Sequence, residues 1–345
     1  MRHILQSLEI TDATQIGAAR RAVARAARAL GFSDQQVAEL EIVVQEIGTN
    51  AVRYATSERW IHFGTTLGMP TGLEVVYWDK GPGIYDVEEA LRDGYSTGGG
   101  LGAGFGAILR LTDEFEIYSS PGVSTARRLK EAARTTSGTV LLVRKWPNPT
   151  MLRNELDRRL GIWSRARAGE EVNGDAFFAQ KRGGDRWLLA VIDGIGHGRG
   201  AQEAAQAATA TLDQWRGEPL EELIARTHEA LRGTRGAVIG IALLDASSGI
   251  LQYAGVGNVE ARAIGISCTL ISMNGTLGAR LPRVRVHTCP WQQGATLVIA
   301  SDGLSRSWDV ISYPALLERS PQLIASLLMR DYGRTADDAT VLVAR

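Results

Sequence analysis

The feature that most constrains this chain is a glycine-rich run at residues 93–106, in which seven of fourteen residues are glycine. Glycine loses more backbone entropy on ordering than any other residue, so this density is typical either of disorder or of a backbone that approaches a ligand closely. The run leads into residues 105–111, whose apolar pattern is compatible with a helix. A glycine loop that opens a helix presents free N–H groups and the positive end of the helix dipole to an anion. The run therefore predicts a phosphate-binding loop.

Two common phosphate-binding motifs do not fit this run. The alternation of Gly100, Gly102, Gly104 and Gly106 suggests a dinucleotide loop, but that loop directly follows a strand, and residues 87–93 here read as a short helix and a turn. A Walker A loop needs Gly-Lys-Ser/Thr, which the chain lacks. Another nucleotide-binding fold is therefore required.

Composition places limits on the partners and the location of the protein. Its 345 residues suffice for two domains, and 44% of them are hydrophobic. Lys plus Arg and Asp plus Glu both number 38, so the charge balance favours neither a nucleic acid nor a membrane as partner. The N-terminal residues lack a signal-peptide core, and no apolar run is long enough to span a membrane. The two cysteines, Cys268 and Cys289, have no metal-ligand spacing, and we expect reduced thiols in a cytoplasmic protein.

Two helices are predicted before the glycine run. Residues 16–30 have helical periodicity and end at Gly31, and Ser33 is placed to cap the next helix. Glu46 and Asn50 lie four residues apart on that second helix and so share a face. A surface pair is the common interpretation, and a pair that projects into a nucleotide site is the alternative. The apolar stripes are Ile16, Ala19, Val23, Ala27 and Leu30 on the first helix, and Val37, Leu40, Val44, Ile47, Ala51 and Tyr54 on the second.

A buried strand is predicted at residues 73–78 and ends in Asp79, with Gly81 and Gly83 following. Asp-x-Gly after a strand is usually a turn. The same position also suits a carboxylate that accepts a hydrogen bond from a purine amine.

Taken in order, these motifs resemble the Bergerat-type ATPases, a family shared by sensor histidine kinases, gyrase and MutL. More closely, the glycine run together with residues 113–117 resembles the RsbT-type switch kinases of bacterial stressosomes. The resemblance covers residues 10–118 and resumes at 137–146. It implies an α/β sandwich that binds ATP with Mg²⁺ and transfers phosphate to Ser or Thr of a STAS-domain partner.

The resemblance implies a role for each matching residue. Glu46 would act as the base for the acceptor hydroxyl, Asn50 would hold Mg²⁺, and Asp79 would contact adenine, with Gly81 and Gly83 beside the base. Phosphoryl transfer needs positioning and charge neutralisation more than covalent chemistry, which suits such a set. The residues that would surround the ATP phosphates are Ser96, Thr97, Gly100, Leu101, Gly102, Ala103 and Gly104.

One segment departs from the family pattern. Residues 119–136 are longer and more basic than the tight turn that the resemblance implies. A mobile loop, an extra helix and a partner contact are all open interpretations.

The prolines at 147 and 149 predict a domain boundary. We expect a first domain at residues 1–146, a linker at 147–154 and a second domain at 155–345. In the second domain, acidic residues repeatedly follow apolar strands or occupy turns, as after residues 187–192 and 296–300. Carboxylates at strand ends could meet around Mg²⁺ or Mn²⁺, which prefer oxygen ligands. The acidic positions are Asp175, Asp193, Asp302, Asp337 and Asp338.

This pattern resembles the metal-dependent type 2C protein phosphatases, in the SpoIIE-like branch that includes the RsbX-type enzymes, over residues 155–345. The resemblance implies an αββα sandwich with two Mn²⁺ or Mg²⁺ ions. Asp193 would bridge the ions with the Gly194 carbonyl and Asp175 assisting, and Asp302 and Asp337 would complete the second ion. Asp338 is the weaker candidate of its pair.

Four further polar residues receive a structural interpretation. His197 could serve as an acid near the leaving group, but a surface or capping histidine is the favoured interpretation. His228 is interpreted as a helix-surface histidine, and Asn258 and Asn274 as turn residues rather than substrate contacts.

The sequence as a whole predicts an α+β protein of two domains. We expect a bifunctional switch that phosphorylates and dephosphorylates Ser or Thr of a STAS-domain partner, and a homodimer is compatible with this expectation. The alternative is an ATP-binding module that captures a partner in the manner of an anti-sigma factor, joined to an active phosphatase.

Overall fold

The computed structural model describes residues 5–91, 104–121, 137–148 and 155–345, and these residues form two compact units. The N-terminal unit lies within His3–Arg158 and also contains Asp309–Leu327. The C-terminal unit contains Arg159–Trp308 and Leu328–Arg345. Among the described residues, no helix combines the length and the apolar character needed to cross a membrane.

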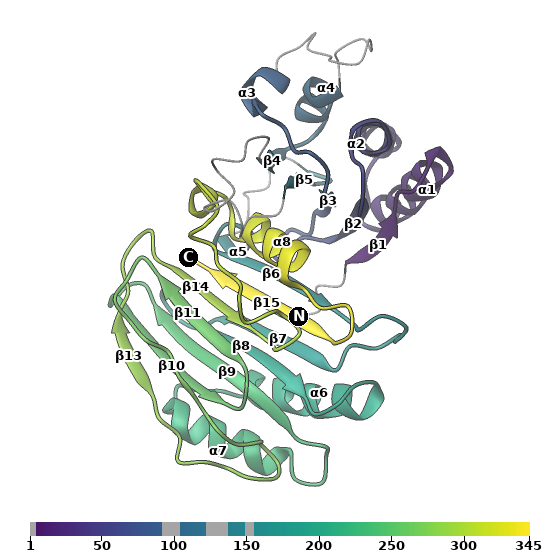
Figure 1. Ribbon diagram of the computed structural model, residues 1–345. Coiled ribbons are helices and arrows are strands. Elements are labelled where there is room, and N and C mark those ends of the chain that lie inside the picture. The colour runs from purple at the N-terminus through teal and green to yellow at the C-terminus, as the bar shows by residue number, and fades with distance from the viewer. Residues whose placement is uncertain (1–4, 92–103, 122–136, 149–154) are drawn as a thin grey trace. The chain divides into compact units, whose positions relative to one another are not determined.

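The N-terminal unit is built on an antiparallel sheet of five strands in the order β1-β2-β3-β5-β4 (Figure 1). Its strands are β1 (Gln6–Glu9), β2 (Trp60–Thr65), β3 (Leu73–Trp78), β4 (Glu114–Ser120) and β5 (Gly138–Lys145). Its helices are α1 (Ala13–Ala29), α2 (Asp34–Tyr54), α3 (Val87–Ala90), α4 (Gly104–Leu111) and α5 (Glu155–Arg159).

The ends of α1 and α2 follow from local sequence. Asp12 caps α1 by accepting a hydrogen bond from the Thr14 N–H, and Gly31 adopts φ +83 just beyond the helix, as predicted for a stop signal. Ser33 and Gln36 form a capping box at the start of α2, which confirms the predicted N-cap.

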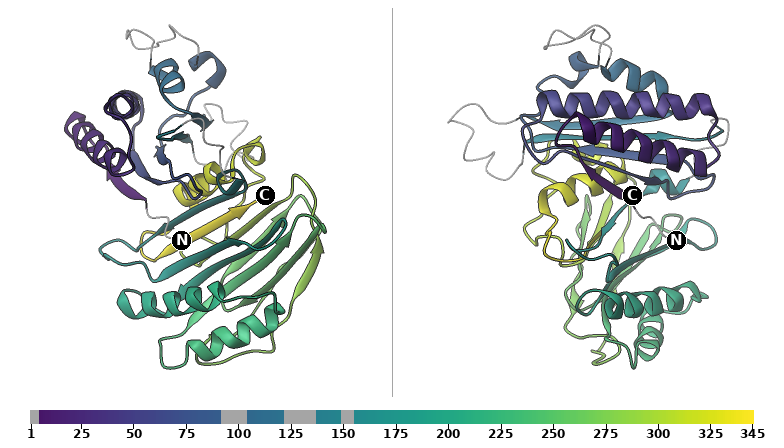
Figure 2. Two further views of the ribbon diagram at one scale, coloured as in Figure 1. Left: turned by 180° about the vertical axis from the view of Figure 1, so that it is seen from behind. Right: turned by 90° about the vertical axis from the view of Figure 1, so that its right-hand side faces the viewer.

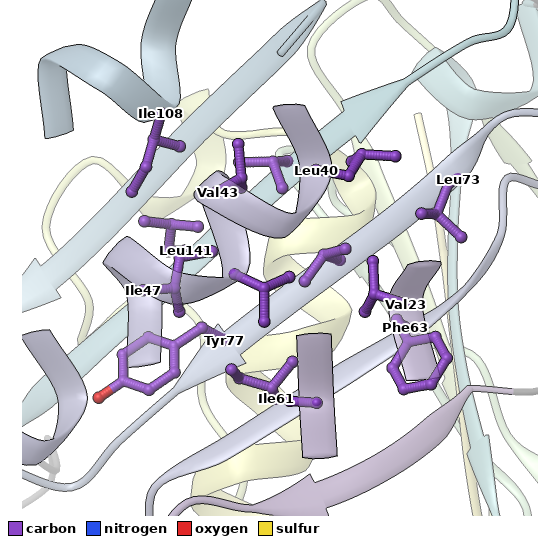
Figure 3. Close-up of a cluster of buried hydrophobic side chains, with 14 of the residues drawn as sticks. Val23, Leu40, Val43, Ile47, Ile61, Phe63, Leu73, Tyr77, Ile108 and Leu141 are labelled. Carbon is purple, nitrogen blue, oxygen red and sulfur yellow. The ribbon is translucent and has the colours of Figure 1, made fainter. Parts of the chain in front are cut away.

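One face of this sheet packs against α1, α2 and α4. Side chains alternate along a strand, so Ile61, Phe63, Tyr77 and Leu141 all lie in the core on the helical side (Figure 3). The predicted apolar stripes form this core, with one correction. Tyr54 is 41% exposed, because it is the last residue of α2 and has no following turn to cover it.

The opposite face of the same sheet is covered by later parts of the chain. Arg144 is buried there, and its Nε donates to Glu74 Oε2 at 2.7 Å. Its Nη1 donates to the backbone oxygen of Asp157 in α5 at 3.3 Å. From the segment Asp309–Leu327, the Ser320 N–H donates to Glu116 Oε2 at 3.0 Å, and the Tyr313 ring meets the Tyr118 ring edge-on. This segment is therefore part of the N-terminal unit although it is distant in sequence.

The C-terminal unit contains two antiparallel-rich sheets. The larger has the order β12-β10-β9-β8-β7 with β13 also paired to β10, and the smaller has the order β11-β14-β15-β6. The strands of the larger sheet are β7 (Asp175–Lys181), β8 (Arg186–Gly194), β9 (Ala237–Asp245), β10 (Ile250–Val256), β12 (Ser272–Met273) and β13 (His287–Pro290). Those of the smaller are β6 (Leu160–Arg165), β11 (Glu260–Ile264), β14 (Thr296–Ala300) and β15 (Ala339–Ala344). The strands predicted at residues 187–192 and 296–300 are confirmed by β8 and β14.

Two helices cover the larger sheet. The alanine-rich α6 (Arg199–Asp213) and α7 (Leu220–Ala230) lie side by side on its outer face (Figures 1 and 2). Small residues such as Ala204 and Ala208 let α6 approach the strands closely. The remaining helical elements are a short 3₁₀ turn, η2 (Leu316–Glu318), and α8 (Pro321–Tyr332).

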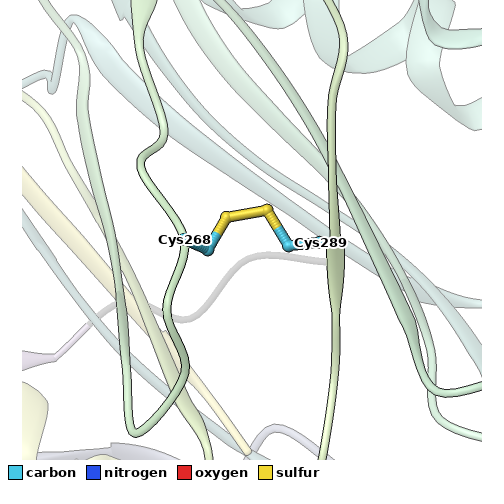
Figure 4. Close-up of a disulfide and its surroundings, with 2 residues drawn as sticks. All are labelled: Cys268 and Cys289. Carbon is cyan, nitrogen blue, oxygen red and sulfur yellow. A yellow bond between two sulfur atoms is a disulfide. The ribbon is translucent and has the colours of Figure 1, made fainter.

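Two expectations about single residues are wrong. Cys268 and Cys289 form a disulfide with a Cα–Cα distance of 6.0 Å, so they are not free thiols (Figure 4). They are brought together because β13, which contains Cys289, pairs with β10 and returns beside the segment after β11. His228 is not a surface residue but is 5% exposed, because it continues the apolar stripe of α7, and its Nδ1 accepts a hydrogen bond from the Gly278 N–H at 3.0 Å.

Candidate functional site

The candidate nucleotide site brings together two helices of the N-terminal unit. Glu46 and Asn50 lie on α2, and Gly104 is the first residue of α4. A Cβ atom at Gly104 would lie 3.3 Å from Asn50 Nδ2 and 3.4 Å from Glu46 Oε2. The predicted pair therefore shares a face and meets the backbone at which the glycine run becomes a helix. An oxygen-bearing pair beside a helix N-terminus suits a phosphate with its cation.

Asp79 follows β3 and is held firmly. Its N–H donates to the Thr139 carbonyl at 3.0 Å, and its Oδ1 accepts from the Gly81 N–H at 2.6 Å. Only 6% of Asp79 is exposed. A Cβ at Gly81 would lie 2.8 Å from Asp79 Oδ1 and 3.1 Å from the Ala55 Cα, so glycine is required for this turn to fit under the end of α2.

Gly83 has a clear structural requirement of its own. It adopts φ +73, and a Cβ there would lie 2.3 Å from the Ser120 carbonyl oxygen. The neighbouring Ile84 N–H donates to Ser119 Oγ at 2.7 Å. This close approach to β4 accounts for glycine at position 83 before any nucleotide is considered.

Most of the predicted lid lies outside the described residues. This applies to Ser96, Thr97, Gly100, Leu101, Gly102 and Ala103, and to residues 122–136 of the basic segment.

The second candidate site is a group of carboxylates in the C-terminal unit. Asp175 begins β7 and Asp193 lies at the end of β8, and the two residues are directly opposite each other across the strand pair. Asp302 follows β14, and Asp337 precedes β15 in the neighbouring sheet. The separate sequence motifs thus meet at the ends of paired strands.

The negative charges in this group interact strongly. Burial raises the pKa of Asp193 to about 9, with the carboxylates of Asp175, Asp302 and Asp337 adding to the shift. Burial also raises the pKa of Asp175 to about 7. The hydrogen bond that Ser301 Oγ donates to Asp175 Oδ2 at 2.6 Å acts in the opposite direction and lowers this pKa. Such repulsion favours a cation at this place.

The donor chemistry of the group fits Mg²⁺ or Mn²⁺, since hard cations prefer carboxylate oxygens. Within the described ranges, however, no three His, Cys, Asp or Glu side chains are already arranged to ligate one ion together. In this structure Asp302 Oδ2 accepts a hydrogen bond from Asn258 Nδ2 at 2.6 Å. Asn258, interpreted as a turn residue, is thus in contact with a candidate ligand.

Asp338 has a different environment from Asp337. Its Oδ1 accepts from the Arg167 N–H at 2.9 Å, and its Oδ2 accepts from the Gly174 N–H at 3.0 Å. Both oxygens therefore serve to hold the loop that leads into Asp175. Asp337 also accepts a hydrogen bond, from the Asp338 N–H to its Oδ1 at 3.0 Å, and its place as the better ligand of the pair stays a prediction.

The loop after Asp193 is shaped by close backbone packing. A Cβ at Gly194 would lie 2.2 Å from the Ala201 carbonyl oxygen, so only glycine fits there. His197 is half exposed, and its Nδ1 lies 2.8 Å from Glu170 Oε1. Its carbonyl oxygen accepts from Arg235 Nη1 at 3.1 Å. Sequence reasoning did not find the roles of Glu170, Arg235 or Ser301, because each contacts a residue that lies far from it in the chain.

Two protein-family models match the chain in succession. Residues 10–128 match the histidine kinase-like ATPase domain, and residues 183–345 match the stage II sporulation protein E family.

Two curated proteins of Bacillus subtilis (strain 168) are similar to different parts of the chain. The serine/threonine-protein kinase RsbT is 37% identical over 111 residues, which is 32% of this chain and 83% of RsbT. The phosphoserine phosphatase RsbX is 26% identical over 187 residues, which is 53% of this chain and 92% of RsbX.

Solved structures add two further similarities. A chain from work on the bacterial stressosome, described as a modular system adapted to control secondary messenger signalling, is 35% identical with a TM-score of 0.51. The match covers 54% of this chain and 98% of that one. A crystal structure of RsbX in complex with magnesium is 25% identical with a TM-score of 0.49, covering 56% of this chain and 96% of that one.

Proposed function

Since the chain belongs to the histidine kinase-like ATPase family that includes RsbT, and carries a SpoIIE-type domain similar to RsbX, we propose that it is a bifunctional protein kinase and phosphatase. The N-terminal unit transfers the γ-phosphate of ATP to Ser or Thr of a STAS-domain partner. The C-terminal unit removes phosphate from phosphoserine or phosphothreonine. The observation that carries this proposal is that a single chain spans 83% of a kinase and 92% of a phosphatase.

In the kinase, the chain's own residues position the reactants. Glu46 accepts the proton of the acceptor hydroxyl, and Asn50, four residues further along α2, offers its amide oxygen to the Mg²⁺ that accompanies ATP. Asp79 accepts a hydrogen bond from the adenine amine. The proximity of Gly104 to Glu46 and Asn50 supports this arrangement, because it brings the start of α4 beside both side chains.

The proposed lid comprises Ser96, Thr97, Gly100, Leu101, Gly102 and Ala103. Backbone N–H groups of such a loop would bind the phosphates and exclude water. ATP as the phosphate donor also fits a cytoplasmic protein.

In the phosphatase, divalent cations would be held by Asp193, Asp175, Asp302 and Asp337, and the Gly194 carbonyl would be a further ligand. A pair of Mg²⁺ or Mn²⁺ ions bound there would supply an activated water for in-line attack on phosphorus. Burial raises the pKa of Asp193 to about 9 and the neighbouring carboxylates add to the shift, which supports a cation-binding role. Ser301 orients Asp175 through its hydrogen bond, and Asn258 orients Asp302.

The experiment uses a purified STAS-domain protein encoded near the gene for this chain and measures its phosphorylation by intact mass. ATP and Mg²⁺ are added first, and Mn²⁺ is added later. With wild type, we expect a gain of one phosphate and its loss after Mn²⁺. With Asp193→Ala the phosphate should persist, and with Glu46→Ala it should not form.

An ATP-binding capture module is the second candidate function, because partner binding could use the same nucleotide fold. Capture of the partner, rather than phosphate transfer to it, would be supported by two results together. The partner would gain no phosphate with Asp193→Ala although ATP binds tightly, and Glu46→Ala would keep its affinity for the partner.

A further inference from the structure

We propose that Arg235 is a positioning residue for divalent-cation binding, which restrains the loop of residues 194–200 and with it the Gly194 carbonyl. This inference deepens the proposed function and rests on cation binding by the C-terminal unit. It assigns a role to a residue outside the acidic motifs, because its side chain contacts the loop that begins at the end of β8.

The position of Arg235 follows from the pairing of β8 with β9. Gly194 lies opposite Ala237 at the end of this ladder. Just beyond it, the Ile195 N–H donates to the Gly236 carbonyl at 3.0 Å. The loop after Gly194 therefore begins beside the segment that leads into β9, and Arg235 belongs to that segment.

The guanidinium group of Arg235 lies against the backbone of this loop. Its Nη1 donates to the His197 carbonyl at 3.1 Å. A Cβ atom at Gly200 would lie 2.6 Å from Arg235 Nε, and one at Gly196 would lie 3.4 Å from its Nη1. The arginine side chain thus occupies space that Gly196 and Gly200 leave open, and it spans the loop as far as the first turn of α6.

The loop gains a restraint that its own residues do not supply. Gly196 and Gly198 adopt φ +85 and +74, and Gly198 caps α6 without a side-chain hydrogen bond. Glycine loses much backbone entropy when it is ordered. The ring of His197, whose Nδ1 lies 2.8 Å from Glu170 Oε1, gives a second restraint. A loop that is held in place before the cation arrives loses less entropy when it binds.

Two other roles for Arg235 compete with this one. Guanidinium groups match phosphate oxygens well, so Arg235 could bind the substrate, or it could simply stabilise the fold. The contacts favour positioning, because Nη1 is engaged by the His197 carbonyl and Nε lies over Gly200. Within the part of the chain that the structure describes, no ion pair joins Arg235 to a carboxylate.

Two substitutions separate these roles. Arg235→Gln removes the charged donor. Gly200→Ala places a methyl group where Arg235 Nε lies and so displaces the side chain, while alanine favours the helix more than glycine does. Arg232→Gln is a matched control, because Arg232 is an exposed arginine of the same connection between α7 and β9, and its Nε lies 2.8 Å from Glu229 Oε2.

The experiment is isothermal titration calorimetry of Mn²⁺ into the metal-free full-length protein without nucleotide, and Asp193→Ala identifies the heat that belongs to this site. We expect Arg235→Gln and Gly200→Ala each to weaken Mn²⁺ binding roughly tenfold, as loss of a hydrogen bond from a charged group implies. The double variant should lose no more than either single variant, since both remove the same contact. Arg232→Gln should stay within about twofold of wild type.

Thermal unfolding and hydrolysis of p-nitrophenyl phosphate give two further readouts. Gly200→Ala should unfold at a temperature no lower than wild type, because the substitution favours the helix. The hydrolysis rate of Arg235→Gln should be low at limiting Mn²⁺ and should recover at saturating Mn²⁺, with the KM for the ester unchanged.

The outcomes separate this inference from the function on which it rests. If the variants bind Mn²⁺ as tightly as wild type, the positioning role is wrong while the phosphatase assignment stands. A raised KM in Arg235→Gln at unchanged Mn²⁺ affinity would instead assign Arg235 to the substrate phosphate. If wild type binds no Mn²⁺, the proposed phosphatase function fails, and the inference fails with it.

Discussion

The disulfide between Cys268 and Cys289 leads to a quantitative prediction for the stability of the C-terminal unit. It joins residues with a sequence separation of 21. A cross-link of this span removes chain entropy from the unfolded state worth about 3 kcal/mol at 25 °C. For a domain of 150–250 residues, each kcal/mol corresponds to roughly 2–4 °C in Tm. Reduction should therefore lower the Tm of this unit by roughly 6–12 °C.

The assay is thermal unfolding of the full-length protein by differential scanning calorimetry, with and without a phosphine reductant. A thiol titration in denaturant confirms the oxidation state of each sample. The double variant Cys268→Ala, Cys289→Ala is the control, and its Tm should not respond to the reductant.

Two results would refute this reasoning. Oxidised protein that titrates two free thiols would show that the pair does not form. Fully reduced wild type that unfolds at the same temperature as oxidised protein would show that the link does not restrain the unfolded chain. A Tm change shared by the double variant would trace to the reductant itself.

Three further substitutions have defined outcomes. Arg144→Met leaves the buried Glu74 without a counter-ion, so the free energy of unfolding, measured by chemical denaturation, should fall by about 3–5 kcal/mol. Most of this loss should be recovered in the double variant that also carries Glu74→Gln. His228→Leu leaves the Gly278 N–H without its acceptor and should cost about 1–3 kcal/mol, measured by the same unfolding assay, whereas His228→Gln should cost less. Gly303→Ala would place a methyl group 1.9 Å from the Asp338 carbonyl oxygen, so we expect Mn²⁺-dependent hydrolysis of p-nitrophenyl phosphate to fall about a hundredfold while ATP binding is retained.

The sequence predicted the local features best. Ser33 with Gln36 is a complete capping signal within four residues, and Gly31 is a local stop. The strands before Asp193 and Asp302 were recognisable as apolar runs bounded by Asp-Gly. Each of these depends only on neighbours in the chain.

The features that were missed depend on pairings between distant residues. The register that sets Asp175 opposite Asp193 is fixed by the whole β7–β8 ladder, and Ser301 reaches Asp175 only because two sheets meet. Cys268 and Cys289 meet through the pairing of β13 with β10, which no local pattern indicates.

His228 is a different case, because a signal was present. It lies four residues after Ile224 and eight after Leu220, on the buried stripe of α7. The helical period thus indicated burial, and the polar character of histidine was given too much weight.

The assignment of Asp309–Leu327 to the N-terminal unit has a consequence for how this gene can be divided. By sequence the segment falls within the match to the sporulation protein family, at residues 183–345, yet Ser320 and Tyr313 complete the far side of the other unit's sheet. A cut after residue 146 would therefore separate the N-terminal half from part of its own fold. The two units therefore cannot be separated by a single cut in the chain.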